Sequence, residues 1–486
     1  MRTELDALTL DPASPKEWEA LRQAGHRLVD QVLARHRDLR SGPCWQAPSP
    51  EARSHYADPA PREGVGIERA MAMAEQRIVR HGTGNLHPRF WGWVIGAGNL
   101  PGILGQWLSA GMNANVFAGD QGPVHLELQV LRWFREGFGW PASSSGILTG
   151  GASMANLLAL AVARHWATGG AVKESGPEAA AGLRLYASEA THNSILKAAQ
   201  VMGMGSVAVR WVPAPLGRID LDALANMVAE DRQRGLRPFC LVANAGTVGV
   251  GAIDPFPSLR AFADQNHLWL HVDGAIGALG WLAPALRPRL EGMTLGDSLA
   301  FDLHKWGQVP YDAGCLLVRD GELHRATFQS GAEYLGTLDG GLTPHGSHPF
   351  NAFSPLLSRG DRALKIWMTL QALGTDRLAG IFEKNAAQAE HLAGLVKAHP
   401  DLELMNPVEL NIVCFRYRGQ AAESELDGIN ERILVELQES GFCVMSPFRL
   451  GGRFCLRVAI ANHRTLRTDL EALVERVAGL GGRAWF

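Results

Sequence analysis

The strongest candidate for a chemically active residue in this sequence is a lysine that follows an apolar run. The run Leu299–Asp302 is followed closely by His304, Lys305 and Trp306. Ligands of open α/β sheets bind beyond the carboxyl ends of the strands. A lysine placed there can form a Schiff base with a carbonyl group. The alternative is a surface lysine at the end of a strand, but the flanking histidine and tryptophan favour the chemical interpretation.

An aspartate closes a second apolar run. The run Leu268–Val272 is followed by Asp273, Gly274 and Ala275. A carboxylate in this place can pair with the positively charged ring nitrogen of a bound ligand, and the small neighbours leave room for that ring. The alternative is an aspartate that caps the next helix. Taken alone, the segment is compatible with both interpretations.

A glycine-rich turn links a third apolar run to a helix. The turn reads Thr149-Gly150-Gly151-Ala152-Ser153. Free backbone N–H groups at the start of a helix, together with a serine hydroxyl, suit a phosphate group. The turn is neither a G-x-x-x-x-G-K-[ST] loop nor a G-x-G-x-x-G motif. The alternative is a capped turn between a strand and a helix.

Two further candidates lie where predicted strands end. His192, in Ser188–Ala199, can stack on an aromatic ligand or act as an acid or base; a purely structural histidine is the alternative. Thr247 lies in the glycine-rich segment Asn244–Pro255 and offers a hydroxyl donor.

The elements that must position these residues alternate along the chain. Apolar runs predict strands at Gly146–Thr149, Leu183–Ala187, Val207–Trp211, Phe239–Ala243, Leu268–Val272, Leu299–Asp302 and Gly314–Val318. Helical segments are predicted between many of them, at 153–166, 193–202, 220–234 and 256–266. Strands buried on both faces and joined by helical crossovers indicate an α/β fold with a mostly parallel sheet.

The two ends of the chain have different patterns. Helices are predicted at 15–37 and 66–80, and the proline-rich segment 41–64 is predicted to be an extended connection. The C-terminal part predicts one long helical stretch over 362–399, then an α+β end with strands at 402–405, 410–417, 442–446 and 454–461, a helix at 423–439 and a last helix from Thr465. We therefore expect three domains: an N-terminal helical arm (1–86), a large domain (87–360) and a small domain (361–486).

Composition excludes several classes of protein. The chain has 486 residues, a net charge of -3, 46% hydrophobic and 20% charged residues. These values exclude collagen, coiled coil and wholesale disorder, and they give no bulk basic signal for nucleic acid or an anionic membrane. The six scattered cysteines favour free thiols over disulfides or a zinc site. We expect no metal site, no secretory signal, no membrane span and a cytoplasmic location.

The candidates also occur in a recognisable order. Phosphate turn, histidine, threonine loop, aspartate and lysine together resemble the pyridoxal-phosphate enzymes of the aminotransferase-like fold (fold type I). The closest resemblance is to the group II amino-acid decarboxylases, which include those for aromatic amino acids, glutamate and histidine. It extends from about His87 to the last helix. The matching segments are His87–Phe90, Thr149–Leu158, His192–Ile195, Ala245–Thr247, His271–Asp273, Asp302–Trp306 and Leu364–Trp367.

The resemblance implies a role for each matching residue. Lys305 would form the internal aldimine with the cofactor, Asp273 would hold the pyridine nitrogen protonated, and His192 would stack on the ring near the substrate carboxylate. The matches to the phosphate site are Ala152, Ser153 and His304, with Asp302 where some members have asparagine, and those beside the ring are Thr247 and Ala275.

The resemblance also bears on the reaction and the substrate. Tyr334 matches a loop tyrosine that is placed to protonate the substrate Cα. Some aldehyde-forming relatives have phenylalanine at this position, so Tyr334 favours amine formation. The matches to the substrate pocket are Trp91, Trp93, Val94 and, across a dimer interface, Phe117. Val94-Ile95-Gly96 departs from the Phe-Pro-Thr of animal aromatic decarboxylases. Arg457 matches an arginine of the small domain, which implies a partner for a carboxylate or a phosphate.

The resemblance implies a homodimeric lyase of amino-acid metabolism. It would convert an L-amino acid to the amine and CO2 through a quinonoid intermediate. The tryptophan and phenylalanine side chains of the implied pocket favour an aromatic substrate. The alternatives are an aldehyde synthase, a decarboxylase of an acidic or diamino acid, and a non-enzymatic relative that uses the fold to bind a partner. The complete set of Lys305, Asp273, His192 and Ser153 favours an enzyme.

Overall fold

The computed structural model describes residues 9–330, 339–343 and 349–483 of the chain. It divides into two compact units. One comprises Met1–Phe90 with Leu434–Val444, and the other comprises Trp91–Ile433 with Met445–Phe486. The division into three domains at residues 86 and 360 stays a prediction.

The N-terminal unit is helical. Its helices are α2 (Pro15–Arg37), α3 (Pro50–Ser54) and α4 (Ile67–Arg77). Helix α2 begins as the sequence predicts, because the Ser14 side chain accepts the Glu17 N–H. The proline-rich connection is predicted to be extended, but part of it is helical. Pro50 opens α3, and the Ser49 hydroxyl accepts the Ala52 N–H at 3.0 Å.

A seven-stranded sheet forms the centre of the second unit. Its strands are β1 (Ser145–Thr149), β2 (Leu183–Ser188), β3 (Val209–Val212), β4 (Arg237–Asn244), β5 (Trp269–Asp273), β6 (Ser298–Asp302) and β7 (Gly314–Val318). The order is β1-β7-β6-β5-β4-β2-β3, and only β7 runs antiparallel to its neighbours. The predicted mostly parallel sheet is confirmed.

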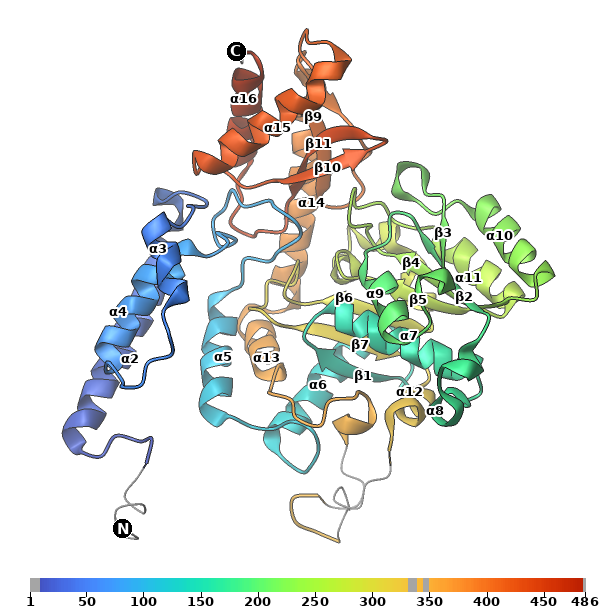
Figure 1. Cartoon of the computed structure of the whole chain (residues 1–486), viewed down its shortest axis with the longest axis horizontal. Helices are drawn as coiled ribbons and strands as arrows, with labels where there is room; N and C mark the ends of the chain where they lie inside the picture. Colours follow the sequence, from blue (N-terminus) through green and yellow to red (C-terminus); the bar gives the residue numbers. More distant parts are fainter. Residues whose placement is uncertain (1–8, 331–338, 344–348, 484–486) are drawn as a thin grey trace. The chain divides into compact units, whose positions relative to one another are not determined.

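Helices cover this sheet, as its apolar strands require. The helices between residues 100 and 328 are α5 (Leu100–Met112), α6 (Gly122–Gly137), α7 (Ala152–Ala167), α8 (Val172–Ser175), α9 (Ser194–Val201), α10 (Leu221–Gln233), α11 (Phe256–Asn266) and α12 (Gly321–Phe328). Of these, α6, α7, α10, α11 and α12 contact strands, whereas α5 packs on α13, and α8 and α9 pack on α7. Helix α7 crosses the sheet and contacts β1 and β4–β7 (Figure 1). Its alanines and leucines pack on the strands while its first turn lies at their carboxyl edge.

The C-terminal part has the α+β pattern that the sequence predicts. Its elements are α13 (Ala363–Leu373), α14 (Thr375–Ala398), β8 (Leu402–Leu404), β9 (Ile412–Tyr417), α15 (Glu423–Glu439), β10 (Ser446–Leu450), β11 (Arg453–Ala459) and α16 (Arg467–Gly481). The strands form an antiparallel sheet in the order β10-β11-β9-β8 (Figure 1).

Two predicted elements are wrong here. The long helical stretch is two helices, because Gly374 takes a positive φ of 73° between α13 and α14. The strand predicted at 442–446 instead begins at Ser446. The turn Gly451-Gly452, with φ values of 57° and 81°, sets the register of the β10–β11 hairpin and excludes the preceding apolar run from it.

Three further features of the described residues concern the cysteines, the apolar helices and the possible metal ligands. All six cysteines are free and buried. No helix in the described ranges is long and apolar enough to cross a membrane. Across the same ranges, no cluster of three or more histidine, cysteine, aspartate or glutamate side chains could hold a metal ion.

The register of the large sheet brings the predicted site residues to one edge. Asp273, the last residue of β5, pairs with Asn244 of β4 and Ala300 of β6. Asp302 and Thr149, the last residues of β6 and β1, both pair with Gly314 of β7. The carboxyl ends of β1, β4, β5 and β6 therefore meet where α/β sheets bind ligands.

Candidate active site

Lys305 lies beside a buried carboxylate at the end of β6. Its Nζ is 2.8 Å from Asp302 Oδ2, and the exposed fractions of the two side chains are 22% and 3%. The other oxygen, Oδ1, accepts the Ala152 N–H at 2.6 Å and lies 3.7 Å from His304 Nε2. One carboxylate thus connects the lysine, the first turn of α7 and an imidazole. The Ala152 N–H, predicted for a phosphate, is bonded to Asp302 here.

The His304 ring has a defined orientation. Its Nδ1 accepts the Ala313 N–H at 3.1 Å, so a neutral ring carries its proton on Nε2, which faces Asp302. The ring stacks on Tyr311 with the centroids 4.2 Å apart. Burial lowers the pKa of His304, although the nearby Asp302 opposes that shift.

The start of α7 is shaped to accept an anion. Gly151 has a φ of +146° at the N-cap position and provides no side-chain cap. A Cβ on Gly314 would collide with the backbone of Gly151, so only glycine allows this close approach. Within the described ranges, the Ser153 hydroxyl has no recorded hydrogen bond. Because the Ala152 N–H is bonded to Asp302, the N–H and hydroxyl of Ser153 are the groups that remain at this helix N-terminus, where such donors suit a phosphate group.

Asp273 is held from two sides at the end of β5. Its Oδ1 accepts the Ala275 N–H at 3.1 Å, and its Oδ2 accepts Asn156 Nδ2 at 2.9 Å. No α-helix follows directly, because the next helical turn is the 3-10 segment Ala278–Leu282. Asp273 therefore does not cap an α-helix.

His192 lies beyond the end of β2 within electrostatic reach of the lysine and both aspartates. Its Nδ1 accepts the Ser194 N–H at 3.2 Å and contacts Ser194 Oγ at 2.9 Å. The residue is exposed, but enough of its ring is covered to lower the pKa of His192. Asp273 opposes that shift, whereas Lys305 adds to it. The neutral ring therefore dominates at neutral pH.

The loop after β4 is fixed from both sides. Thr247 is buried, and its Oγ1 accepts the Ala252 N–H at 3.1 Å. Arg457 of β11 is also buried and donates to the carbonyls of Val248, Gly249 and Trp93. Arg457 thus binds three backbone carbonyls, where the sequence suggested a carboxylate or phosphate partner.

The four predicted pocket residues differ in exposure. Trp91 is fully buried, and its Nε1 donates to Thr465 Oγ1 at 3.2 Å. Val94 is buried and Phe117 is half-buried, whereas Trp93 is 56% exposed. The backbone carbonyl of Phe117 accepts the Asn351 N–H at 3.1 Å.

Trp93 is presented by a fixed backbone. It has a positive φ of 49°, and its N–H donates to Ser446 Oγ at 2.6 Å. A Cβ on Gly96 would collide with the carbonyls of His304 and Lys305, so this segment runs directly against the lysine backbone. The tryptophan lies three residues away from that contact.

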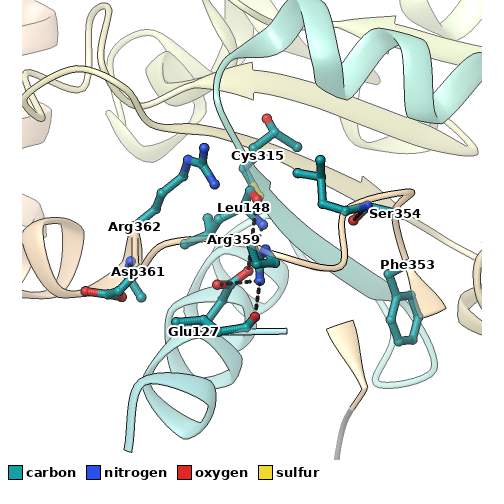
Figure 2. Close-up of polar contacts among 12 residues, drawn as sticks. Glu127, Leu148, Cys315, Phe353, Ser354, Arg359, Asp361 and Arg362 are labelled. Carbon is teal, nitrogen blue, oxygen red and sulfur yellow. Dashed lines mark hydrogen bonds and ion pairs between the residues drawn. The ribbon is translucent and has the colours of Figure 1, made fainter. Parts of the chain in front are cut away.

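A buried ion pair supports the strand before the phosphate turn (Figure 2). Arg359 Nη1 and Nη2 donate to the two Glu127 oxygens at 3.0 and 2.8 Å, and both side chains are 0% exposed. Glu127 Oε1 accepts the Leu148 N–H at 3.0 Å, and Arg359 Nη2 donates to the Leu148 carbonyl at 2.8 Å. Because β1 is an edge strand, the pair satisfies backbone groups that no other strand can reach.

Sequence reasoning missed several of these supports. Glu127 and Arg359 were not singled out, nor was Asn156 as a contact of Asp273, nor Ser194 as a partner of His192. A signal existed for Glu127 and Asn156, because each is a polar residue on an otherwise apolar face of a helix. Tyr334 lies outside the described residues.

Comparisons with known proteins agree on one family. Residues 52–418 match the model described as the pyridoxal-dependent decarboxylase conserved domain. The chain is 29% identical over 468 residues to an aromatic-L-amino-acid decarboxylase of Bacillus atrophaeus, covering 95% of both chains. It is 27% identical to a phenylacetaldehyde synthase of Arabidopsis thaliana, covering 92% of both. The crystal structure of Oryza sativa TDC with PLP and tryptamine superposes with a TM-score of 0.88 at 24% identity, covering 97% of this chain and 99% of that one.

Proposed function

The chain belongs to the pyridoxal-dependent decarboxylase family and is a pyridoxal-phosphate-dependent amino-acid decarboxylase, and we propose that it converts an aromatic L-amino acid to the corresponding amine and CO2. The relatives named for aromatic amino acids support this substrate class. The geometry of Trp93 is the observation in this chain that carries it.

The residues present fit the cofactor. The uncapped start of α7 with the Ser153 hydroxyl suits its phosphate, and Lys305 offers the amine that would hold its aldehyde carbon. Asp273 offers a buried carboxylate for the ring nitrogen, and His192 lies within electrostatic reach of both. When bound, pyridoxal phosphate supplies an electron sink for the charge left on Cα as CO2 departs.

Each side chain has a separate task in this proposal. Asp273, oriented by its two donors, holds a proton at the ring nitrogen. His192 presents Nε2–H as a donor toward the substrate carboxylate, because its Nδ1 accepts from Ser194. Asp302 holds the Lys305 ammonium until the amine is needed. Thr247 and Ala275, which lie just beyond the ends of β4 and β5, would stand beside the ring.

Trp93 supports an aromatic substrate. Its indole is exposed, its backbone is fixed by Ser446 and Arg457, and its segment runs against the Lys305 backbone. An aromatic wall with a fixed backbone suits an aromatic side chain, since ring pairs add to ordinary apolar burial.

The test is to supply the purified enzyme with pyridoxal phosphate, air and single amino acids, and to identify the products by mass spectrometry. Tryptophan, tyrosine and phenylalanine should yield arylethylamines, and glutamate and 2,4-diaminobutyrate should yield nothing. Turnover restricted to the acidic or diamino acid would contradict the proposal and favour the other substrate classes.

The substitution Trp93→Ala should raise KM for the aromatic substrate by about tenfold, because a burial contact of about 1–3 kcal/mol is lost. Steady-state kinetics would measure it. The matched control is Trp166→Ala, which removes another partly exposed tryptophan at the far end of α7. An unchanged KM in Trp93→Ala would remove Trp93 from the pocket.

Tyr334 is proposed to decide between amine and aldehyde. The phenylacetaldehyde synthase among the relatives supports keeping the second reaction open. Without a phenol to protonate Cα, oxygen can react there instead, so Tyr334→Phe should gain hydrogen peroxide and ammonia and lose most of its amine product. A coupled peroxide assay would detect this gain. Peroxide from the unaltered enzyme would instead favour the aldehyde synthase.

We propose that the enzyme is a homodimer. Helix α5 carries Leu100, Leu104, Leu108 and Met112, four exposed apolar side chains at a spacing of four residues. Such a stripe is costly in water and suits the same helix of a second copy.

The double substitution Leu104→Asp with Leu108→Asp should convert the dimer to a monomer, because each copy would bring two buried carboxylates to face those of the other copy across the two-fold axis. Sedimentation velocity would measure the mass. Val207→Asp introduces the same charge at an exposed apolar position outside the stripe and should leave the dimer intact. A monomeric unaltered protein would rule out the homodimer.

We also propose a cytoplasmic location. Six free, buried thiols without a disulfide support a reducing compartment.

A further inference from the structure

One buried asparagine interrupts the apolar face of α7. Asn156 is followed by Leu157-Leu158-Ala159-Leu160 and is almost wholly buried. Asparagine disfavours the interior of a helix, and a buried amide costs free energy unless its polar atoms are bonded. Its position one turn after the phosphate-binding start of the helix therefore calls for specific partners.

All the partners of Asn156 belong to the site or its support. Its Nδ2 donates to Asp273 Oδ2 at 2.9 Å and to Ser194 Oγ at 3.0 Å. Its Oδ1 contacts His271 Nε2 at 2.9 Å. The orientation of the amide is determined, because the flipped amide would turn its oxygen toward a carboxylate oxygen.

A chain of donors behind Asn156 fixes this orientation. Because Asn156 Oδ1 can only accept, His271 carries its proton on Nε2, and its bare Nδ1 accepts from Ser298 Oγ at 2.8 Å. Ser298 Oγ in turn accepts Trp269 Nε1–H at 2.9 Å. Burial lowers the pKa of His271 to about 4, so the ring stays neutral at neutral pH.

The chain continues from Asn156 to His192. Since Ser194 Oγ accepts from Asn156, its own hydrogen is available for His192 Nδ1 at 2.9 Å. The Ser194 backbone N–H also points at that nitrogen. The remaining ring nitrogen, Nε2, then carries the proton.

We propose that Asn156 is a positioning residue that supports two active-site groups at once: it orients the Asp273 carboxylate directly and fixes the Nε2–H tautomer of His192 through Ser194. The inference rests on the proposed roles of Asp273 and His192 toward the cofactor ring. It adds one amide that contributes to both orientations, beside the Ser194 backbone N–H that also faces His192 Nδ1.

The affinity for pyridoxal phosphate tests the first half. Asn156→Ala should weaken binding by about ten- to a hundredfold, because it leaves Asp273 Oδ2 without a donor. Titration of the apoprotein, followed by cofactor absorbance without substrate, would measure Kd. Asn430→Ala is the matched control, since Asn430 is an equally buried asparagine whose side-chain partners in the described part of the chain are the backbone groups of Tyr417 and Leu426. Equal Kd values for the Asn156 and Asn430 variants would overturn the proposal.

Nitrogen NMR of 15N-histidine-labelled, cofactor-free protein tests the second half, with His192→Gln for assignment. We expect a bare Nδ1 and a protonated Nε2 on His192. Ser194→Ala removes a donor to Nδ1, which eases protonation and should raise the pKa of His192 by about half to one pH unit. Asp273, Asp302, Lys305 and Lys197, the charged groups that act on this ring, remain unchanged.

A protonated Nδ1 in the unaltered protein, or no pKa change in Ser194→Ala, would overturn the second half. Both NMR results are independent of the reaction. Failure of the unaltered protein to bind pyridoxal phosphate would instead count against the proposed function. In that case the NMR results would still test the hydrogen bonds from Asn156 through Ser194 to His192.

Discussion

Lys305→Ala should lower decarboxylation by about a thousandfold or more, the largest effect expected of any single substitution here. Lys305 lies three residues beyond the end of β6, and Asp302 holds its ammonium at 2.8 Å. Alanine offers no amine to hold the cofactor aldehyde or to be displaced by the substrate amine. Amine production measured by mass spectrometry would give the rate.

A second readout separates loss of attachment from loss of fold. Borohydride reduction should fix the cofactor to Lys305 in the unaltered enzyme, at a peptide identified by mass spectrometry, and to no peptide in the variant. Lys397→Ala, at an exposed position near the end of α14, should retain both activity and labelling. Full activity with a reducible attachment in Lys305→Ala would assign the chemistry to another lysine.

Arg359→Met should destabilise the protein by about 3–5 kcal/mol, because it leaves the fully buried Glu127 carboxylate without its cation. Burial already raises the pKa of Glu127, and Arg359 opposes that shift. The Leu148 carbonyl loses its donor in the same step. Denaturant unfolding followed by circular dichroism would measure the change.

The double substitution Glu127→Leu with Arg359→Met should recover part of that loss. It removes the unpaired charge but leaves both backbone groups of Leu148 unsatisfied, so full recovery is not expected. Arg325→Met is the control, because it breaks an exposed ion pair with Glu322 and should cost less than about 1 kcal/mol. A double variant less stable than Arg359→Met would refute the assignment of the loss to an unpaired carboxylate.

Local sequence patterns correctly predict where the chemistry-bearing residues lie on their helices and strands. Asp273 and Asp302 end strands, and Ser153 opens a helix, as predicted. These placements follow from short-range patterns: apolar runs, glycine turns and helical periodicity. Because the ends of parallel strands must share one edge, the meeting of these residues could also be expected.

Local pattern gave a wrong answer where two structures fit the same residues. The helical periodicity of 362–399 gives no sign that Gly374 has a positive φ and ends the first of two helices. The apolar run before Ser446 reads as a strand, but the turn Gly451-Gly452 sets the register of the hairpin beyond it. In both cases a backbone conformation, and not hydrophobicity, decided the boundary.

The hydrogen-bond partners of the site residues depend on contacts between distant parts of the chain. Asp302 takes the N–H of Ala152 from 150 positions away, and Asn156 reaches Asp273 across 117. Arg359 finds Glu127 across 232 positions. Apolar periodicity records which face of an element is buried, but not which polar group lies opposite. Hydrogen bonds and buried charges depend on distances of about 3 Å in space, which packing alone sets.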